Sequence, residues 1–311
     1  MSGVGGYKQI NTSLIVSAFE DYLSTQFERL PKLPDVELLS SRVIRVLGQN
    51  PGKFTLQGTN TYIVGSGSSR LIIDTGQGNP EWAHLIASTL ETLGIKLCYV
   101  LLTHWHGDHT GGVPDLLRLY PHLSTAIYKN SPAHGQRDIT DGQVFSVEGA
   151  TVRSLYTPGH SHDHMSFILE EERAMFTGDN ILGHGTTAFE DLDRLMVSWN
   201  KMQEEDCLLG YPAHGIVISD LRWKIEREIA LKINREDRVL QALQRLRPGD
   251  KGRSESVSIR QLASLIYGEG VSEEVRNQAV EPLTEEVLQK LAEDGKVGFE
   301  MRNGERLWFG F

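Results

Sequence analysis

Short apolar runs, separated by glycine-rich turns, dominate the chain between residues 43 and 176. Their length and their β-branched residues predict strands at 43–46, 61–64 and 71–73. Residues 80–93 have the apolar spacing of a helix that ends at Gly94. Further strands are predicted at residues 97–102, 125–128, 143–147, 151–156, 166–169 and 174–176, and a helix at residues 189–203. This order predicts an α/β fold, a four-layer αββα sandwich with a helix layer outside each of two sheets.

The two ends of the chain have a different, mostly helical pattern. Residues 13–30 have amphipathic spacing and predict a helical extension that packs on the core. A long helical pattern at 221–247 ends at Pro248-Gly249-Asp250. Two more helices are predicted at 259–267 and 282–294, followed by a hairpin of residues 296–299 and 306–309 around Asn303-Gly304. We therefore predict an N-terminal extension (1–40), a core domain (41–220) and a C-terminal helical, winged-helix-like module (221–311).

Composition narrows the class of protein. The 311 residues are 39% hydrophobic and 23% charged, which is ordinary for a soluble globular protein. No apolar run has the 18 residues of a membrane span, and no signal sequence begins the chain. We therefore expect a cytoplasmic protein with no membrane partner. Cys98 and Cys207 are too few for a disulfide framework, and we expect both to be buried, inert thiols.

The net charge of −10 is unevenly distributed along the chain. Basic residues dominate from residue 222 to 260, and acidic residues dominate after that segment. A basic helix face could dock an acidic carrier protein or a nucleic-acid backbone, and a solvated helix with internal ion pairs is the alternative. Winged helices often bind DNA, but the acidic tail argues against DNA. We expect the C-terminal module to be structural or to be a partner-docking lid over the active-site edge.

The strongest chemical signal is the segment Thr103-His104-Trp105-His106-Gly107-Asp108-His109. Three histidines and one aspartate so close together can supply ligands to two metal ions at once. The segment follows the predicted strand at 97–102 and precedes Gly111-Gly112, so it forms a loop at the C-terminal end of a strand. Loops of this kind commonly carry the chemistry of α/β folds. A polar loop of surface histidines is the alternative.

Three more potential ligands follow apolar segments in the same way. His160 comes after Thr157-Pro158-Gly159, Asp179 after Gly178, and His214 after Tyr211-Pro212-Ala213. A two-metal centre needs about six or seven nitrogen and oxygen ligands and an open position for water. We expect one ion to be bound by His104, His106 and His160, the other by Asp108, His109 and His214, and Asp179 to bridge the two.

These residues resemble the pattern of the metallo-β-lactamase fold, H-x-H-x-D-H followed by a single histidine, an aspartate and a histidine. Residues 50–62, 157–165 and 178–186 resemble the branch that holds the β-lactamase-like endoribonucleases. Within that branch, nearly the whole chain resembles fungal acyl-carrier-protein thioesterases, the partners of non-reducing polyketide synthases of the atrochrysone carboxyl type. The resemblance implies a four-layer metallo-β-lactamase sandwich with a small C-terminal winged-helix-like module.

The resemblance also implies an activity, namely metal-dependent hydrolysis of the thioester that links an aromatic polyketide to the acyl carrier protein domain of the synthase. We expect two divalent ions, Zn²⁺ first and Mn²⁺ as the alternative. Asp108 would orient the attacking hydroxide by accepting its proton. His164 lies four residues after His160 and would orient a ligand or contact substrate. His184 would lie near the mouth of the site.

Two other functions remain open at this point. The first is a metal-dependent endoribonuclease on single-stranded RNA, which the neighbouring branch and the basic segment favour. Only that alternative would make RNA a partner. The second is a non-catalytic protein whose metal site is structural and whose tail recruits a synthase. The sequence does not define which polyketide is bound.

Overall fold

A computed structural model describes residues 30–246 and 255–311 of the chain. The predicted N-terminal helix, up to residue 29, and the predicted linker at 248–250 lie outside the described residues. The chain divides into two compact units between Ile225 and Glu226.

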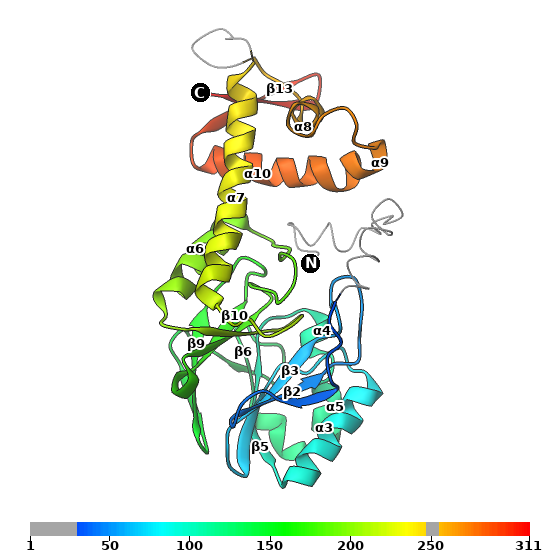
Figure 1. Cartoon of the computed structure of the whole chain (residues 1–311), viewed down its shortest axis with the longest axis vertical. Helices are drawn as coiled ribbons and strands as arrows, with labels where there is room; N and C mark the ends of the chain where they lie inside the picture. Colours follow the sequence, from blue (N-terminus) through cyan, green and yellow to red (C-terminus); the bar gives the residue numbers. More distant parts are fainter. Residues whose placement is uncertain (1–29, 247–254) are drawn as a thin grey trace. The chain divides into compact units, whose positions relative to one another are not determined.

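A seven-stranded sheet is the first strand layer of the unit that ends at Ile225 (Figure 1). Its strands lie side by side in chain order: β1 (Val36–Leu38), β2 (Val43–Leu47), β3 (Asn60–Val64), β4 (Ser69–Ile73), β5 (Lys96–Leu102), β6 (Ile127–Lys129) and β7 (Arg137–Asp138). Strands β1 to β4 pair antiparallel, and β4 to β7 pair parallel. Strand β1 falls in the predicted N-terminal extension, but its pairing with β2 makes it the edge of this sheet.

A five-stranded sheet is the second strand layer, with the order β12-β11-β10-β9-β8. Its strands are β8 (Val144–Val147), β9 (Ala150–Tyr156), β10 (Met165–Leu169), β11 (Ala174–Gly178) and β12 (Leu209–Pro212), and the short helix η2 (Glu170–Glu172) joins β10 to β11. The sequence indicated a strand before His214 only at Leu208-Leu209, whereas β12 runs on through Gly210 and Pro212, which are poor strand formers. Its parallel pairing with β11 holds it in the sheet.

Helices cover the outer faces of both sheets (Figure 1). They are α3 (Pro80–Leu93), α5 (Val113–Leu119), η1 (Pro121–Thr125) and α6 (Leu192–Glu204), and the short α4 (Gly107–Thr110) lies in the loop after β5. Side chains alternate along each strand, so Tyr62 and Val64 pack in the core between the sheets while Ile63 packs with α3. Trp199 of α6 is buried and donates its indole N–H to the Asn180 carbonyl beside the second sheet (3.0 Å). The predicted αββα sandwich is therefore confirmed.

The two cysteines lie in different environments. Cys207 is buried as expected, and burial raises the pKa of its thiol to about 12. Cys98 is partly exposed, so the expectation of a buried thiol is wrong for this residue. The register between β4 and β5 shifts at this position, pairing Arg70 with Leu97 and Leu71 with Tyr99, so Cys98 has no pairing partner and does not alternate into either core.

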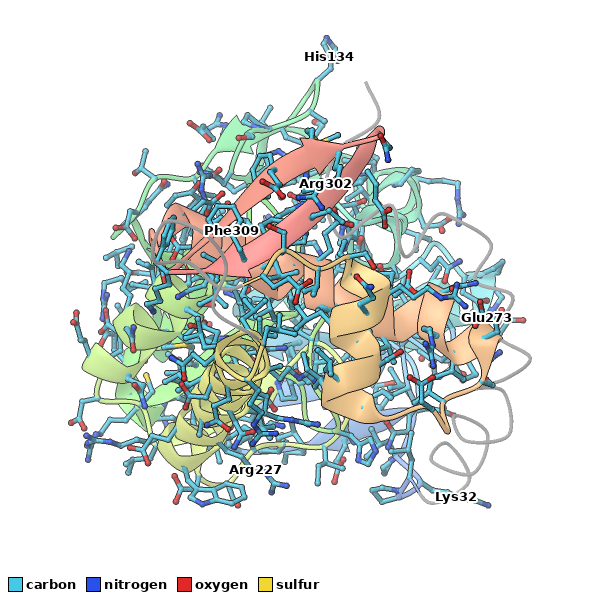
Figure 2. The ribbon with its side chains drawn as sticks, turned by 90° about the horizontal axis from the view of Figure 1, so that it is seen from above. Lys32, His134, Arg227, Glu273, Arg302 and Phe309 are labelled. Carbon is cyan, nitrogen blue, oxygen red and sulfur yellow. The ribbon has the colours of Figure 1, made fainter. Side chains whose placement is uncertain are left out.

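The second unit begins at Glu226 and consists of helices followed by a hairpin. Its elements are most of α7 (Leu221–Gln244), α8 (Ile259–Tyr267), α9 (Glu273–Val275), the π-helical turn η4 (Arg276–Val280), α10 (Glu281–Glu293), β13 (Val297–Arg302) and β14 (Glu305–Gly310). Leu243, Leu262, Leu288 and Trp308 bring α7, α8, α10 and the hairpin into one core. Figure 2 shows Arg302 and Phe309 on the hairpin. The winged-helix-like assignment of this unit stays a prediction.

The basic segment of α7 is less exposed than its sequence indicates. Lys232 is buried, and burial lowers the pKa of its ammonium group to about 8. Arg238 donates to the Ile266 carbonyl (2.9 Å) and lies over the ring of Tyr267. Part of this positive charge is therefore used inside the unit. None of the described helices is both long and apolar enough to cross a membrane.

Candidate metal centre

The loops that follow four strands carry the proposed ligands. The strand ends are Leu102, Tyr156, Gly178 and Pro212. The first ligand after each of them is His104, His160, Asp179 and His214, respectively. His106, Asp108 and His109 complete the loop after β5, where α4 begins at Gly107 and turns His109 into the protein interior. The two sheets thus each contribute one side of the site.

The three histidines predicted for the first ion lie together. His104 Nε2 lies 2.8 Å from His106 Nδ1, and His160 Nε2 lies 3.1 Å from the same atom. Asp179 Oδ2 is 3.4 Å from His160 Nε2. One potential ligand atom from each of these four residues lies within 4.8 Å of all the others.

The second predicted group also assembles, around Asp108. Its Oδ2 atom lies 3.2 Å from His109 Nε2 and 3.3 Å from His214 Nε2. Asp179 turns its other oxygen, Oδ1, toward this group, at 3.2 Å from His214 Nε2 and 3.5 Å from His109 Nε2. Asp179 therefore presents one carboxylate oxygen to each group, which is the arrangement that the predicted bridging role requires.

Asp74 is an important residue that the sequence analysis missed. It is buried at the end of β4, and its carboxylate accepts the Nδ1–H of His109 (2.8 Å) and the hydroxyl of Thr103 (2.8 Å). The Thr103 oxygen is in turn 3.0 Å from His104 Nδ1. One carboxylate therefore fixes the ring orientation of a histidine in each group, leaving Nε2 to face the site. The signal was available, because Asp74 follows the apolar Ile72-Ile73 as other ligands follow their strands.

His160 is oriented from the opposite side. Its Nδ1–H donates to the Ala188 carbonyl at 2.7 Å, and Thr187 Oγ1 lies 3.1 Å from the same nitrogen. This contact also leaves Nε2 as the atom that faces the site. Neither Thr187 nor Ala188 carries a sequence signal, because the contact depends on how the loop before α6 returns to the site.

His164 and His184 have different positions. His164 is fully buried, accepts the backbone N–H of Asp179 at its Nε2 (3.1 Å), and places Nδ1 3.0 Å from Thr157 Oγ1. It therefore contacts a proposed ligand and is not itself in either group. His184 is exposed on the loop whose Gly183 N–H donates to the His214 carbonyl (2.9 Å). His134, which follows no motif, projects outward from its own loop (Figure 2).

The electrostatics of the two groups differ. Burial and the neighbouring imidazoles hold the pKa of His104 well below its usual value and lower that of His106 to about 3. His109 and His214 lie between carboxylates. Although burial opposes it, Asp108 and Asp179 raise the pKa of His109 and bring that of His214 to about 9. His104 and His106 therefore offer neutral imidazoles, while His109 and His214 hold protons that a cation would displace.

The residues present fit divalent cations. His109 Nε2 and Asp179 Oδ1 are buried and make no hydrogen bond within the described part of the chain, although each points into the cluster. Buried polar atoms of this kind are costly unless another partner satisfies them. Imidazole nitrogens and carboxylate oxygens, without sulfur, are ligands for borderline and hard divalent ions. The centre is therefore a site for divalent metal ions.

Several known proteins are similar to this chain. The model of the metallo-beta-lactamase superfamily matches residues 54–214. An atrochrysone carboxyl ACP thioesterase of Claviceps purpurea is 62% identical over 98% of this chain and 97% of its own. A protein of the same name from Aspergillus terreus is 62% identical over 98% and 96%, and the lactamase-like protein notP of an Aspergillus species is 60% identical over 99% and 98%. Among solved structures, a beta-lactamase domain protein from Burkholderia ambifaria covers 89% of this chain and 94% of its own, with a TM-score of 0.66 at 17% identity.

Proposed function

The chain belongs to the metallo-beta-lactamase superfamily, and from this premise we propose that it hydrolyses an acyl-carrier-protein thioester. The substrate is an aromatic polyketide on the carrier domain of a non-reducing polyketide synthase, and the product is the free acid, of the atrochrysone carboxylic acid type, in fungal secondary metabolism. The observation that carries the proposal is the identity of 60–62% over nearly the full chain to relatives named atrochrysone carboxyl ACP thioesterases. The complete ligand set supports it.

The proposed cofactors are two divalent ions, Zn²⁺ first and Mn²⁺ second. When bound, such ions would lower the pKa of a water molecule toward about 7 and polarise the acyl carbonyl. His104, His106 and His160 would hold one ion, and Asp108, His109 and His214 the other, with Asp179 between them. Asp74, Thr103 and Ala188 keep the imidazole rings in the orientation that this requires.

Asp108 is the proposed proton acceptor. Its side chain is 23% exposed, compared with 11% for Asp179 and at most 5% for the histidines of both groups, so it is the ligand most accessible to a substrate. The neighbouring His109 and His214 hold its pKa well below the usual range despite burial, so the carboxylate is ionised and accepts a hydrogen bond from the attacking water. The leaving thiol has a pKa near 8.5 by analogy with cysteine and departs without a general acid.

The test offers the purified, metal-analysed protein a carrier-protein-bound aromatic polyketide thioester and a single-stranded RNA in parallel. We expect release of the free acid, loss of that activity with a chelator, and recovery with Zn²⁺ or Mn²⁺. Asp108→Asn should lower the rate by about 100-fold or more. The matched control is Asp115→Asn in α5, a carboxylate paired with Arg118 outside both groups, which should keep the parent rate.

RNA cleavage without acid release would overturn the thioesterase proposal and favour the endoribonuclease. Salt distinguishes the two activities further. Binding of RNA through phosphate contacts should weaken steeply as the salt concentration rises, whereas the rate of thioester hydrolysis at a saturating concentration of carrier-bound substrate should change little. Unchanged acid release by Asp108→Asn would mean that the metal centre does not perform the reaction.

A further inference from the structure

A buried ion pair joins the two sheets close to the metal centre. Lys129, the last residue of β6, donates its ammonium group to the Asp163 carboxylate, and the two residues are 5% and 0% exposed. The second oxygen of Asp163 accepts the Ser161 hydroxyl (2.8 Å). Lys129 Nζ also donates to the Asn130 carbonyl (2.7 Å). Both charges are therefore compensated by well-placed hydrogen bonds in the protein interior.

The position of this pair relates it to the three-histidine group. In the parallel pairing of β5 and β6, Lys129 lies opposite Leu102, the residue that ends β5 two positions before His104. Asp163 lies in the turn between β9 and β10, three residues after His160. The pair thus links the loop that carries His104 and His106 to the turn that carries His160. A backbone hydrogen bond from Met165 to the Thr103 carbonyl (2.7 Å) crosses between the sheets at the same place.

The energetics argue for a role other than stability. Taking a lysine and an aspartate out of water costs several kcal/mol for each ion, and well-packed apolar residues are often as stable as the pair they replace. A buried ion pair does fix the distance and relative orientation of the two segments that carry it, because each charged group must stay within hydrogen-bonding distance of its partner. This differs from Lys201 and Asp141, an ion pair on the surface of the same unit whose side chains are 34% and 53% exposed.

We infer that Lys129 and Asp163 are positioning residues that set the distance between His160 and the His104–His106 loop, and so determine the affinity of the three-histidine site for its cation. Neither side chain touches the ligand atoms, so the effect would act through the turn at residues 157–164. The inference rests on the metal centre used in the proposed function. It does not depend on the identity of the substrate.

The test measures Zn²⁺ binding by competition with a chromophoric chelator, together with thermal unfolding of the metal-free protein. The informative variant combines Lys129→Met, Asp163→Leu and Ser161→Ala, which removes both charges and the hydroxyl together. Removing all the polar partners at once avoids leaving an uncompensated buried charge. We expect metal-free protein that melts near the parent temperature but binds Zn²⁺ at one of its two sites ten- to a hundredfold more weakly.

Parent-like affinity at both sites in that variant would overturn the inference and leave the pair a structural feature only. If the triple variant does not fold, the double variant Lys129→Met with Asp163→Asn, which leaves no buried charge and keeps the size of the Asp163 side chain, is measured in the same two ways. The matched control is Arg118→Met in α5, which breaks an exposed pair with Asp115 away from this turn and should leave both Zn²⁺ affinities unchanged. A parent protein that binds no Zn²⁺ or Mn²⁺ would contradict the proposed function itself, and that result is distinct from a variant that binds normally.

Discussion

Individual residues show how far a sequence can define a metal centre. One rule, an apolar strand followed by a turn residue and then a ligand, led to His160, Asp179 and His214, and the structure brings all seven predicted ligands into two groups. The rule missed Asp74, although Asp74 also follows a strand. Some carboxylates accept a hydrogen bond from the Nδ1–H of a histidine ligand, and others bind the cation directly. The two kinds look alike in sequence. Only the three-dimensional position of the imidazole distinguishes them.

His164 and His184, the two further histidines predicted near the site, can be tested by substitution. His164→Ala should weaken Zn²⁺ binding by about 10- to 100-fold, because it removes the acceptor of the Asp179 backbone N–H. His184→Ala, at an exposed position, should leave the affinity unchanged. Both are measured by chelator competition on the metal-free proteins. Equal affinities for the two variants would show that His164 does not orient Asp179.

At the scale of elements, periodicity predicted the long segments well and the short ones poorly. The helix at 80–93 has the predicted bounds, supported by Asn79 as N-cap and Gly94 in the left-handed conformation as C-cap. The helix predicted at 189 begins instead at Leu192, because the Asp191 side chain caps it by accepting the Arg194 N–H. Strands such as β1 and β12 form because a neighbouring strand pairs with them, and such pairing is invisible in a local window.

The turn between β9 and β10 must pack tightly on α6, and Gly159 makes this possible. Its φ of +138° is unfavourable for other residues, and a Cβ atom there would lie 2.4 Å from the backbone of Leu195. Gly159→Ala should therefore destabilise the sandwich by about 2 kcal/mol and weaken Zn²⁺ binding, because His160 is the next residue. Denaturant unfolding and metal analysis test this. Gly135→Ala is a fitting control for the added methyl group alone, since Gly135 also has positive φ but open space around it.

Helix α10 carries a carboxyl whose protonation should depend on folding. Burial raises the pKa of Glu286 from 4.5 to about 7, although Lys232 and Arg235 of α7 oppose the shift and Glu285 adds to it. Between these two pH values the folded protein holds a proton that the unfolded chain has released, so stability falls as the pH rises through this window. Glu286→Gln has no carboxyl proton to release, so its folding stability should fall by about 2 kcal/mol less than that of the parent over this pH range.

The measurement is denaturant unfolding of the parent and Glu286→Gln at about pH 5 and about pH 7.5, on either side of most of this window. The variant should gain stability relative to the parent only at the higher pH. A difference that is the same at both values would contradict a raised pKa for Glu286. The suitable control is Glu293→Gln, which changes a second carboxyl of the same helix that is exposed to solvent.

At the scale of the whole molecule, the resemblance of the sequence to a known family supplied what local patterns could not. Periodicity indicated two sheets and their helices, but the placement of the ligand loops at one edge required the topology of both sheets. The basic segment at 222–260 shows a feature that the sequence revealed only in part. Its charge was visible in sequence, whereas the burial of Lys232 follows from packing within the second unit.

Removal of the metal ions should destabilise the sandwich as a whole. A ligand present at a thousand times its dissociation constant stabilises the folded state by about 4 kcal/mol, which corresponds to roughly 10 °C for a unit of this size. Chelation should therefore lower the melting temperature of the sandwich by about that amount, and added Zn²⁺ should restore it. Calorimetry with and without chelator makes the measurement. An unchanged melting temperature after confirmed metal removal would argue against ligands that connect both sheets.

The distribution of the proposed ligands over both sheets also has a consequence for the order of events during synthesis. His104 emerges from the ribosome long before His214, and the two stand on loops of different sheets. Because non-local pairing must precede the assembly of such a site, a nascent chain has no complete site to offer a cation. We therefore expect the sandwich to reach its fold through its apolar cores and to take up its metal ions after folding. In this respect it is the reverse of a zinc finger, in which the cation directs folding.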